Sequence, residues 1–168
     1  MKEVNYIDVS KQIQRQLSKG SFLTVKDKDG NVNTMTIAWG NLGFMWKKPV
    51  FTVMVRYSRH TYKLIENADD FTVSFPTGAQ LKKELSFCGS KSGRDIDKFK
   101  ELNLKILDGK RVNSPIIADC DISLECKIIY KQALDPSGMG EYVENVYGEE
   151  KDYHVLYYGE ILSCFIND

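Results

Sequence analysis

The chain has no hydrophobic run long enough to cross a membrane and no excess charge of either sign. Its longest apolar stretches are strand-sized, well short of the roughly 20 residues of a transmembrane helix. Lysine and arginine total 23, as do aspartate and glutamate, so the basic excess typical of nucleic-acid-binding proteins is missing. Residues 1–5 show no secretory signal pattern. These absences predict a cytoplasmic protein whose partners are neither nucleic acids nor membranes.

Cysteine pairs with metal-binding spacing are also missing. No Cys-x-x-Cys occurs, and the two histidines, His60 and His154, stand in unrelated contexts, so no zinc or iron–sulfur site is expected. Cys120 and Cys126 share one face of a predicted strand, which predicts buried, reduced thiols. Cys88 could be a reactive thiol, but little around it would lower its pKa, so a structural role is favoured.

What is present is a series of strand patterns with a few helical ones, which suits one domain over residues 1–168. Helical spacing predicts helices over residues 6–17, 62–68, 79–85 and 96–102. A loop without apolar pattern is expected over residues 135–152. The order of elements favours an antiparallel barrel, closed or nearly closed, with a few helices around it. Strands are predicted over residues 21–25, 33–39, 50–56, 71–75, 105–107, 110–112, 116–117, 120–130 and 153–165.

Polar side chains are concentrated where the strand over residues 50–56 ends. Arg56, Ser58, Arg59 and Thr61 lie within six positions, directly before a short helical pattern. Guanidinium groups and hydroxyls at a helix start are suited to binding a phosphate. The sequence therefore predicts an anion site, although the two arginines could also be ordinary surface residues that close a strand.

A second polar stretch, residues 86–95, is rich in glycine and serine and carries Lys91 and Arg94. We expect a loop that precedes the helix over residues 96–102. Its side chains could contribute to the same anion site. The alternative is a simple loop in which Ser92 or Asp95 caps the helix.

Five segments stand in a characteristic order along the chain. They are Asn33-Thr34-Met35-Thr36-Ile37-Ala38-Trp39, Pro49 with its apolar strand and then Arg56-x-x-Arg59-x-Thr61, Phe71-Thr72-Val73-Ser74-Phe75-Pro76, Cys88-Gly89-Ser90-Lys91-Ser92-Gly93-Arg94-Asp95-x-Asp97-Lys98-Phe99, and His154-x-x-x-x-Gly159-Glu160-Ile161. Together they resemble the flavin reductase-like, FMN-binding split-barrel family, and most closely its flavoredoxin-type NAD(P)H:flavin oxidoreductases. The resemblance covers most of the chain. It implies a mainly β fold, an antiparallel split β-barrel of Greek-key type with a few short peripheral helices.

The resemblance further implies a homodimer with FMN near the subunit interface. The main chain of residues 35–39 would lie along the isoalloxazine ring, and residues 56–62 with residues 90–92 would hold the ribityl chain and the phosphate. The cofactor-binding residues implied in this way are Asn33, Thr34, Met35, Thr36, Ile37, Ala38, Trp39, Arg56, Ser58, Arg59, Thr61, Tyr62, Cys88, Gly89, Ser90, Lys91 and Ser92.

The implied activity is transfer of a hydride from NADH or NADPH to FMN, and then of electrons to a flavin, a small redox protein or a metal complex. A non-catalytic FMN-binding electron carrier is the main alternative, and a ligand-sensing barrel without cofactor is a remote one. His154 is the candidate catalytic residue, although a histidine on a strand is more often structural. No Gly-x-Gly-x-x-Gly motif is present to indicate which nicotinamide dinucleotide is used.

Overall fold

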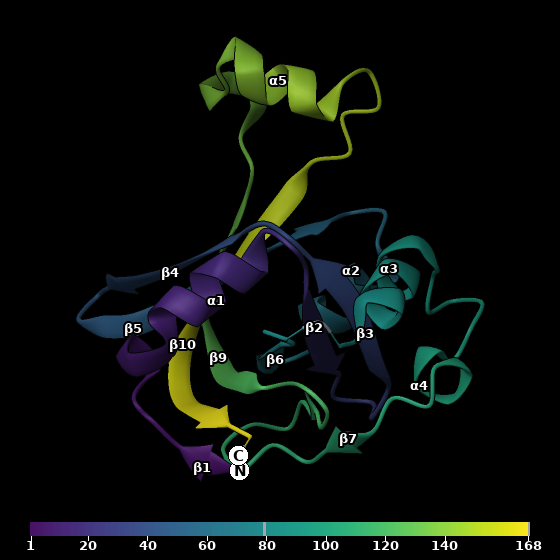
Figure 1. Ribbon diagram of the computed structural model, residues 1–168. Helices are drawn as coiled ribbons and strands as arrows, with labels where there is room; N and C mark the ends of the chain where they lie inside the picture. The colour runs from purple at the N-terminus through teal and green to yellow at the C-terminus, as the bar shows by residue number, and fades with distance from the viewer. Residues whose placement is uncertain (79, 168) are drawn as a thin grey trace.

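The computed structural model describes residues 1–78 and 80–167, and most of its regular elements are strands (Figure 1). The helices are η1 (Tyr6–Val9), α1 (Ser10–Leu17), α2 (His60–Glu66), α3 (Lys82–Ser90), α4 (Lys98–Glu101), η2 (Pro136–Gly138) and α5 (Glu141–Tyr147). The strands are β1 (Lys2–Glu3), β2 (Ser21–Lys26), β3 (Val32–Ile37), β4 (Gly40–Met45), β5 (Lys48–Arg56), β6 (Asp70–Phe75), β7 (Ile106–Leu107), β8 (Ile116–Ile117), β9 (Ile122–Ala133) and β10 (His154–Ile166).

The main sheet is antiparallel and has the strand order β3-β2-β6-β9-β10-β5-β4, with β1 added beside β10. This confirms the mainly β, antiparallel split-barrel fold. The sheet curves but does not close, because β3 and β4 remain its two free edges. These edge strands are consecutive in the chain, and only Ala38 and Trp39 join them.

The N-terminal helix α1 lies across the curved sheet, where it contacts β4 and β6 (Figure 1). Its residues Ile13 and Leu17 are buried in the main core with Phe51 and Phe75, whose rings meet edge to face. Gly20 follows with a φ of 110°, a left-handed conformation that favours glycine. The predicted helix and its glycine stop are therefore confirmed.

The connection expected between the strands over residues 33–39 and 50–56 is itself a strand. β4 pairs with β5 through a two-residue turn at Trp46 and Lys47, whose φ angles are 52° and 61°. Tight hairpin turns of this kind usually contain asparagine, aspartate or glycine. Neither residue of this turn is of those types, so the sequence pattern missed the hairpin.

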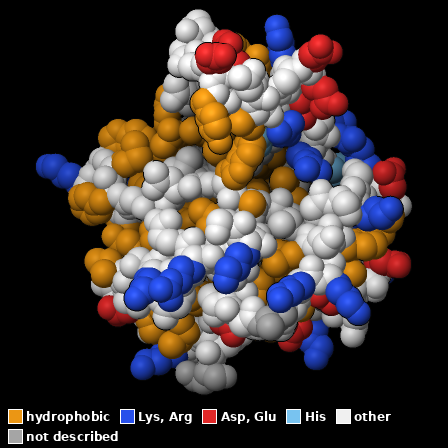
Figure 2. Space-filling view, turned by 45° about the horizontal axis from the view of Figure 1, so that its top comes forward, with side chains coloured by type: hydrophobic (Ala, Val, Ile, Leu, Met, Phe, Trp, Pro, Cys, Tyr) orange, Lys and Arg blue, Asp and Glu red, His pale blue; other side chains and the backbone are white. Residues whose placement is uncertain are grey.

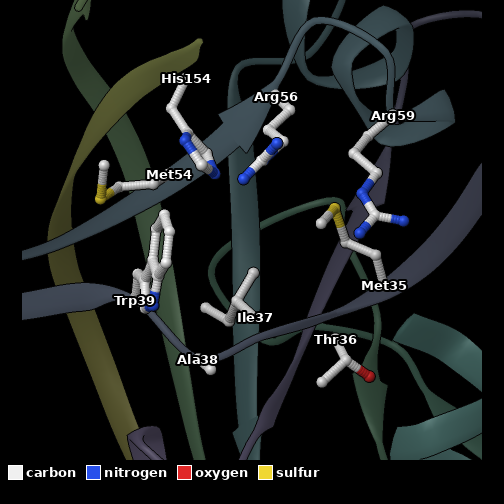
Figure 3. Close-up of a pocket in the computed structure, with 9 residues that line it drawn as sticks. All are labelled: Met35, Thr36, Ile37, Ala38, Trp39, Met54, Arg56, Arg59 and His154. Carbon is white, nitrogen blue, oxygen red and sulfur yellow. The ribbon is translucent and has the colours of Figure 1, made fainter. Parts of the chain in front are cut away.

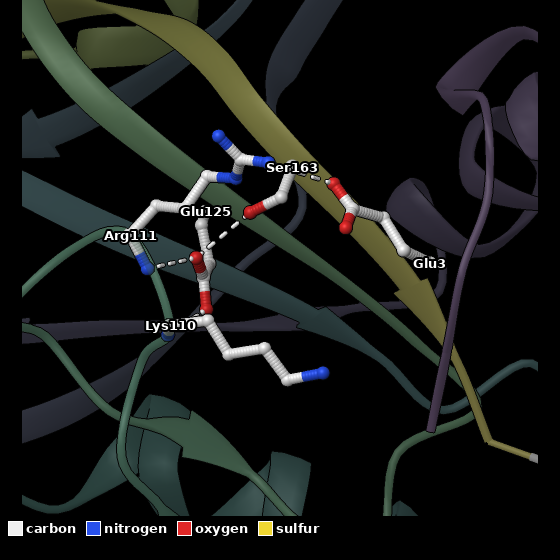
Figure 4. Close-up of polar contacts among 5 residues, drawn as sticks. All are labelled: Glu3, Lys110, Arg111, Glu125 and Ser163. Atoms are coloured by element: carbon white, nitrogen blue, oxygen red, sulfur yellow. Dashed lines mark hydrogen bonds and ion pairs between the residues drawn. The ribbon is translucent and has the colours of Figure 1, made fainter.

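The hairpin predicted around Asp108 and Gly109 is wrong: β7 pairs with β8, and residues 110–112 form no strand. The reason is Glu125, a fully buried carboxylate on β9 (Figure 4). It accepts hydrogen bonds from the main-chain N–H groups of Lys110 and Arg111, at 2.7 and 2.8 Å, and from the hydroxyl of Ser163. Glu125 thus accepts hydrogen bonds from main-chain N–H groups that would otherwise pair with a neighbouring strand.

Two further segments differ from expectation. Residues 86–90 belong to α3 instead of a loop, while Ala79, where the predicted helix began, lies outside the described residues. The expected loop over residues 135–152 contains η2 and α5, and α5 projects from the body as an arm (Figure 1). Three apolar residues of α5, Tyr142, Val143 and Val146, are exposed. The apolar residues of an amphipathic helix usually face the core, and these three do not.

The four cysteines are buried and unbonded, as the alternating pattern around Cys120 and Cys126 predicted. Burial raises the pKa of Cys88 to about 11, even though Lys98 lies close enough to oppose the shift. A thiol with such a pKa is protonated at neutral pH and unreactive, which agrees with a structural role. Within residues 1–78 and 80–167, no helix is both long and apolar enough to span a bilayer.

Candidate functional site

A hollow opens where β3 ends, and the end of β5 and the start of β10 complete its wall (Figure 3). Trp39 lies against His154, with ring centroids 5.2 Å apart. Figure 3 shows the imidazole of His154 directed toward Trp39 and Arg56. The first hollow, as we call it, is lined by Met35, Thr36, Ile37, Ala38, Trp39, Met54, Arg56, Arg59 and His154.

A second hollow adjoins the first and shares Met35 and Arg59 with it. The two have volumes of about 190 and 120 Å³. Together they reach the lower end of the range for small-molecule sites, roughly 300–1,000 Å³. The second hollow is lined by Asn33, Met35, Ser58, Arg59, His60, Thr61, Cys88, Ser90, Lys91, Ser92, Gly93, Arg94 and Lys98.

The charge of both hollows is positive. Four arginine or lysine side chains line the second one, Arg56 is added in the first, and none of the described lining residues is an aspartate or glutamate. His60 also lines the second hollow but adds no charge at pH 7, because burial first, and then the nearby Arg94, Lys63 and Lys98, lower its pKa. Its Nδ1 atom is buried and has no hydrogen-bond partner among the described residues. An anionic ligand fits this donor set.

Lys98 is the most buried of these cations, at 3% exposure. Its Nζ atom donates hydrogen bonds to the main-chain oxygens of Thr34 and Cys88, at 2.9 and 3.0 Å. Burial lowers the pKa of Lys98, and Arg59 adds to this effect. The ammonium group therefore holds β3 and α3 together and also lines the second hollow.

The arginines are held by main-chain oxygens instead of carboxylates. Arg59 donates from Nη1 to the oxygen of Gly89 at 3.0 Å, and Arg94 donates from Nη2 to the oxygen of Ser58 at 2.6 Å. Asp152 accepts from the N–H and the hydroxyl of Ser58, at 3.2 and 2.6 Å, which fixes the turn after β5. Since these arginines contact neutral acceptors, their charge remains available to a ligand.

With this geometry in hand, comparison with known proteins identifies the family. The sequence profile of the flavin reductase like domain matches residues 16–168. The chain belongs to this family. Among curated relatives, an uncharacterized protein of Archaeoglobus fulgidus is 28% identical over 136 residues, which cover 81% of this chain and 66% of the relative. The chain thus spans about two thirds of the length of that relative.

Solved structures show the same fold at low identity. The flavoredoxin of Desulfovibrio vulgaris (Miyazaki F) superposes with a TM-score of 0.70 at 23% identity, over 89% of this chain and 69% of that one. The NADH:FAD oxidoreductase SgcE6 of Streptomyces globisporus C-1027 superposes with a TM-score of 0.67 at 16% identity, over 99% and 88%. At these identities the likeness establishes the flavin reductase-like fold of this chain.

Most of the predicted site residues of this flavin reductase-like domain lie together around the two hollows. Three do not line either one. Thr34 is fully buried and donates to the main-chain oxygen of Leu23, Tyr62 packs edge to face on Tyr57, and Gly89 offers its oxygen to Arg59. Of the predicted hydroxyls, Thr61 accepts a hydrogen bond from Asn33 at 2.8 Å, so it orients a neighbouring lining residue.

The cofactor-binding residues implied by the resemblance leave out five lining residues, Met54, His60, Gly93, Arg94 and Lys98, although the second polar stretch had offered Arg94 as a possible contributor to the anion site. Met54 could have been found, since it shares a strand face with Arg56 at a spacing of two. His60 and Arg94 stood inside the two polar stretches. Lys98 lies in a segment that resembles the family, but its role could not be inferred from its neighbours in sequence, because that role depends on Thr34, 64 positions earlier in the chain.

Proposed function

We propose that this domain binds FMN across the two hollows, with the ring in the first and the phosphate in the second. The observation that carries the proposal is the basic second hollow: Arg59, Lys91, Arg94 and Lys98 line it, and none of its described lining residues is an aspartate or glutamate. FMN has a doubly charged phosphate at one end and a flat, largely apolar ring at the other. The second hollow has more basic lining residues, and the first has more apolar ones. Membership in the flavin reductase like domain family supports this assignment.

Each part of the site has a distinct task in this proposal. Arg59, Arg94 and Lys98 would bind the phosphate through charged donors, and the unpartnered Nδ1 of His60 would find a partner in the ribityl chain or the phosphate. The main chain of residues 35–39 and the side chains of Met35 and Trp39 would bound the ring.

We further propose an NAD(P)H-dependent flavin oxidoreductase. FMN, when bound, supplies the ability to accept a hydride and pass on single electrons, and the protein supplies binding, orientation and exclusion of water. Its second acceptor would be a free flavin, a small redox protein or a metal complex. The NADH:FAD oxidoreductase among the structural neighbours supports this activity, while the flavoredoxin supports the second candidate, an FMN-binding electron carrier.

A homodimer is part of the proposal. Large hydrophobic side chains are exposed on the β4–β5 hairpin and on α5, including Phe44 at 68% and Trp46 at 55%. Figure 2 shows hydrophobic side chains gathered beside and below the projecting arm. Exposed apolar patches of this kind are typical of interfaces. Sedimentation should give twice the chain mass, and Trp46→Ser should shift the equilibrium toward the monomer; a wild-type monomer at micromolar concentration contradicts this part.

The decisive experiment is a flavin titration followed by anaerobic mixing with each nicotinamide dinucleotide. The flavin-free protein should bind FMN with a change in the flavin absorbance spectrum, and should bind riboflavin, which lacks the phosphate, at least 10-fold more weakly because charged hydrogen bonds contribute about 1.5–3 kcal/mol each. Bleaching of bound FMN by NADH or NADPH within seconds supports the oxidoreductase. FMN that binds but stays yellow indicates the carrier, and no FMN binding refutes the proposal.

A further inference from the structure

The projecting arm contributes one buried side chain, and that side chain reaches the candidate site. Tyr147 of α5 is 6% exposed, whereas Tyr142 on the same helix is 82% exposed. The Tyr147 hydroxyl lies 2.7 Å from Nδ1 of His154, and the two rings meet edge to face at 5.5 Å. The guanidinium of Arg56 lies over the Tyr147 ring, 5.4 Å from its centroid. Tyr147 thus contacts two residues that line the first hollow.

The segment that carries Tyr147 is fixed at its other end as well. Asp152, between α5 and β10, accepts two hydrogen bonds from Ser58 of the turn after β5. Tyr153 packs edge to face on Tyr147, with centroids 5.0 Å apart. The Tyr147 ring is therefore enclosed by the arm and by the site, which gives its hydroxyl a defined direction.

The surroundings of the two groups decide which of them donates. Burial first, then Arg56 and Arg59, lower the pKa of His154 to about 4 against the opposing effect of Asp152, so the ring is neutral at pH 7 and carries one proton. His154 is the partner that the structure gives the Tyr147 hydroxyl within residues 1–78 and 80–167. If the hydroxyl accepted from His154, its own proton would have no acceptor in this buried place. The hydroxyl therefore donates to Nδ1.

We propose that Tyr147 is a positioning residue that fixes His154 as the neutral imidazole with its proton on Nε2. The first hollow then receives a hydrogen-bond donor from His154 and no basic nitrogen. This donor suits a ligand that presents a carbonyl oxygen or a negatively charged atom at the Trp39 side of the hollow. The choice of ligand rests on the proposed flavin function, whereas the protonation state of His154 does not.

The protonation state can be read in the flavin-free protein by nuclear magnetic resonance. The chain has two histidines, so a long-range proton–nitrogen spectrum of ¹⁵N-histidine-labelled protein contains two ring systems. His154 should carry its proton on Nε2, and Tyr147→Phe should change the Nδ1 signal and mix the two tautomers. Tyr142→Phe, which removes an exposed hydroxyl from the same helix, should leave the spectrum unchanged. The His60 signals report whether each variant stays folded.

Two results overturn the proposal: a wild-type His154 with its proton on Nδ1, or a His154 spectrum that Tyr147→Phe leaves unchanged. A flavin titration tests the ligand-facing part. Tyr147→Phe should weaken FMN binding roughly 2- to 10-fold, the range of one neutral hydrogen bond, and should leave the FMN-to-riboflavin affinity ratio unaltered. Equal FMN affinity in variant and wild type refutes the ligand-facing donor. Failure of wild-type protein to bind FMN refutes the proposed function. The tautomer of His154 is still decided by the nuclear magnetic resonance spectrum of the flavin-free protein.

Discussion

Lys98 donates a hydrogen bond from Nζ to the main-chain oxygen of Thr34, 2.9 Å away, inside the fold and beside the second hollow. A buried ammonium group thus replaces a neighbouring strand as the partner of an edge-strand carbonyl. The same group also binds the oxygen of Cys88 at the end of α3. One side chain therefore contributes both to the basic hollow and to the packing of α3 on the sheet.

Lys98→Met should lower the free energy of unfolding by about 1–3 kcal/mol, because two buried carbonyl oxygens lose their donor. The measurement is urea unfolding followed by circular dichroism. Lys100→Met is the matched control, since the Lys100 side chain is 87% exposed and its loss should change stability by less than about 0.5 kcal/mol. Equal unfolding midpoints for Lys98→Met and wild type would show that the ammonium contributes nothing.

Arg59→Ala should weaken FMN binding by about 10-fold or more, because a charged donor to the phosphate contributes about 1.5–3 kcal/mol. Riboflavin binding should change far less, since that ligand lacks the phosphate. Arg111→Ala removes an arginine that is paired with Glu3 at 3.5 Å, away from both hollows, and serves as the control. If Arg59→Ala bound FMN with wild-type affinity, the Arg59 guanidinium would not be a phosphate-binding group.

The stability of the domain should fall on acidification between about pH 6.5 and pH 4. Burial and Arg56 lower the pKa of His154 from 6.5 to about 4, so the unfolded chain binds a proton in this range that the folded chain excludes. One proton corresponds to at most about 1.4 kcal/mol per pH unit. His154→Gln should show a shallower loss of stability over the same range, and His60, whose pKa is also lowered, continues to contribute in the variant. Parallel pH profiles would contradict this.

Gly159→Ala should destabilise the fold by about 1–3 kcal/mol through overpacking. Gly159 lies at a register shift between β10 and β9, and a Cβ atom there would come within 2.5 Å of the Phe71 ring and 2.7 Å of Cys126. Gly138→Ala is the control, because a Cβ atom at that position meets nothing within 4 Å. Thermal unfolding compares the two variants directly. Equal melting temperatures would show that Phe71 and Cys126 accommodate the added methyl group without loss of stability.

The fold followed from local patterns wherever apolar core residues recur at every second position of a strand. β3, β5, β6, β9 and β10 were predicted near their observed positions, because their inward side chains are apolar at a spacing of two. β4 was missed because its six residues include Gly40 and Gly43, and because none of the six is fully buried. A strand at a sheet edge carries little of the pattern that marks a central strand.

The site was predicted in part for a similar reason. Arg56 and Arg59 lie within four positions of each other, and their chemistry was visible without a fold. The roles of Lys98 and Tyr147 were not visible, because each side chain contacts a residue that only folding brings close. Lys98 contacts Thr34, and Tyr147 contacts His154 at the start of β10. Long-range contacts of single side chains leave no periodic signal.

The two residues between β3 and β4 have a mechanical consequence. They connect β3 and β4, the two edge strands of the sheet. Because an extended chain spans at most about 3.3–3.6 Å per residue, the seam between these two edges cannot widen at the end where Ala38 and Trp39 lie. The opposite end of the seam has no such covalent tether. We therefore expect fluctuations that separate β3 from β4 to begin at the ends of these strands far from Trp39, and the first hollow, which Trp39 lines, to keep its width while they occur.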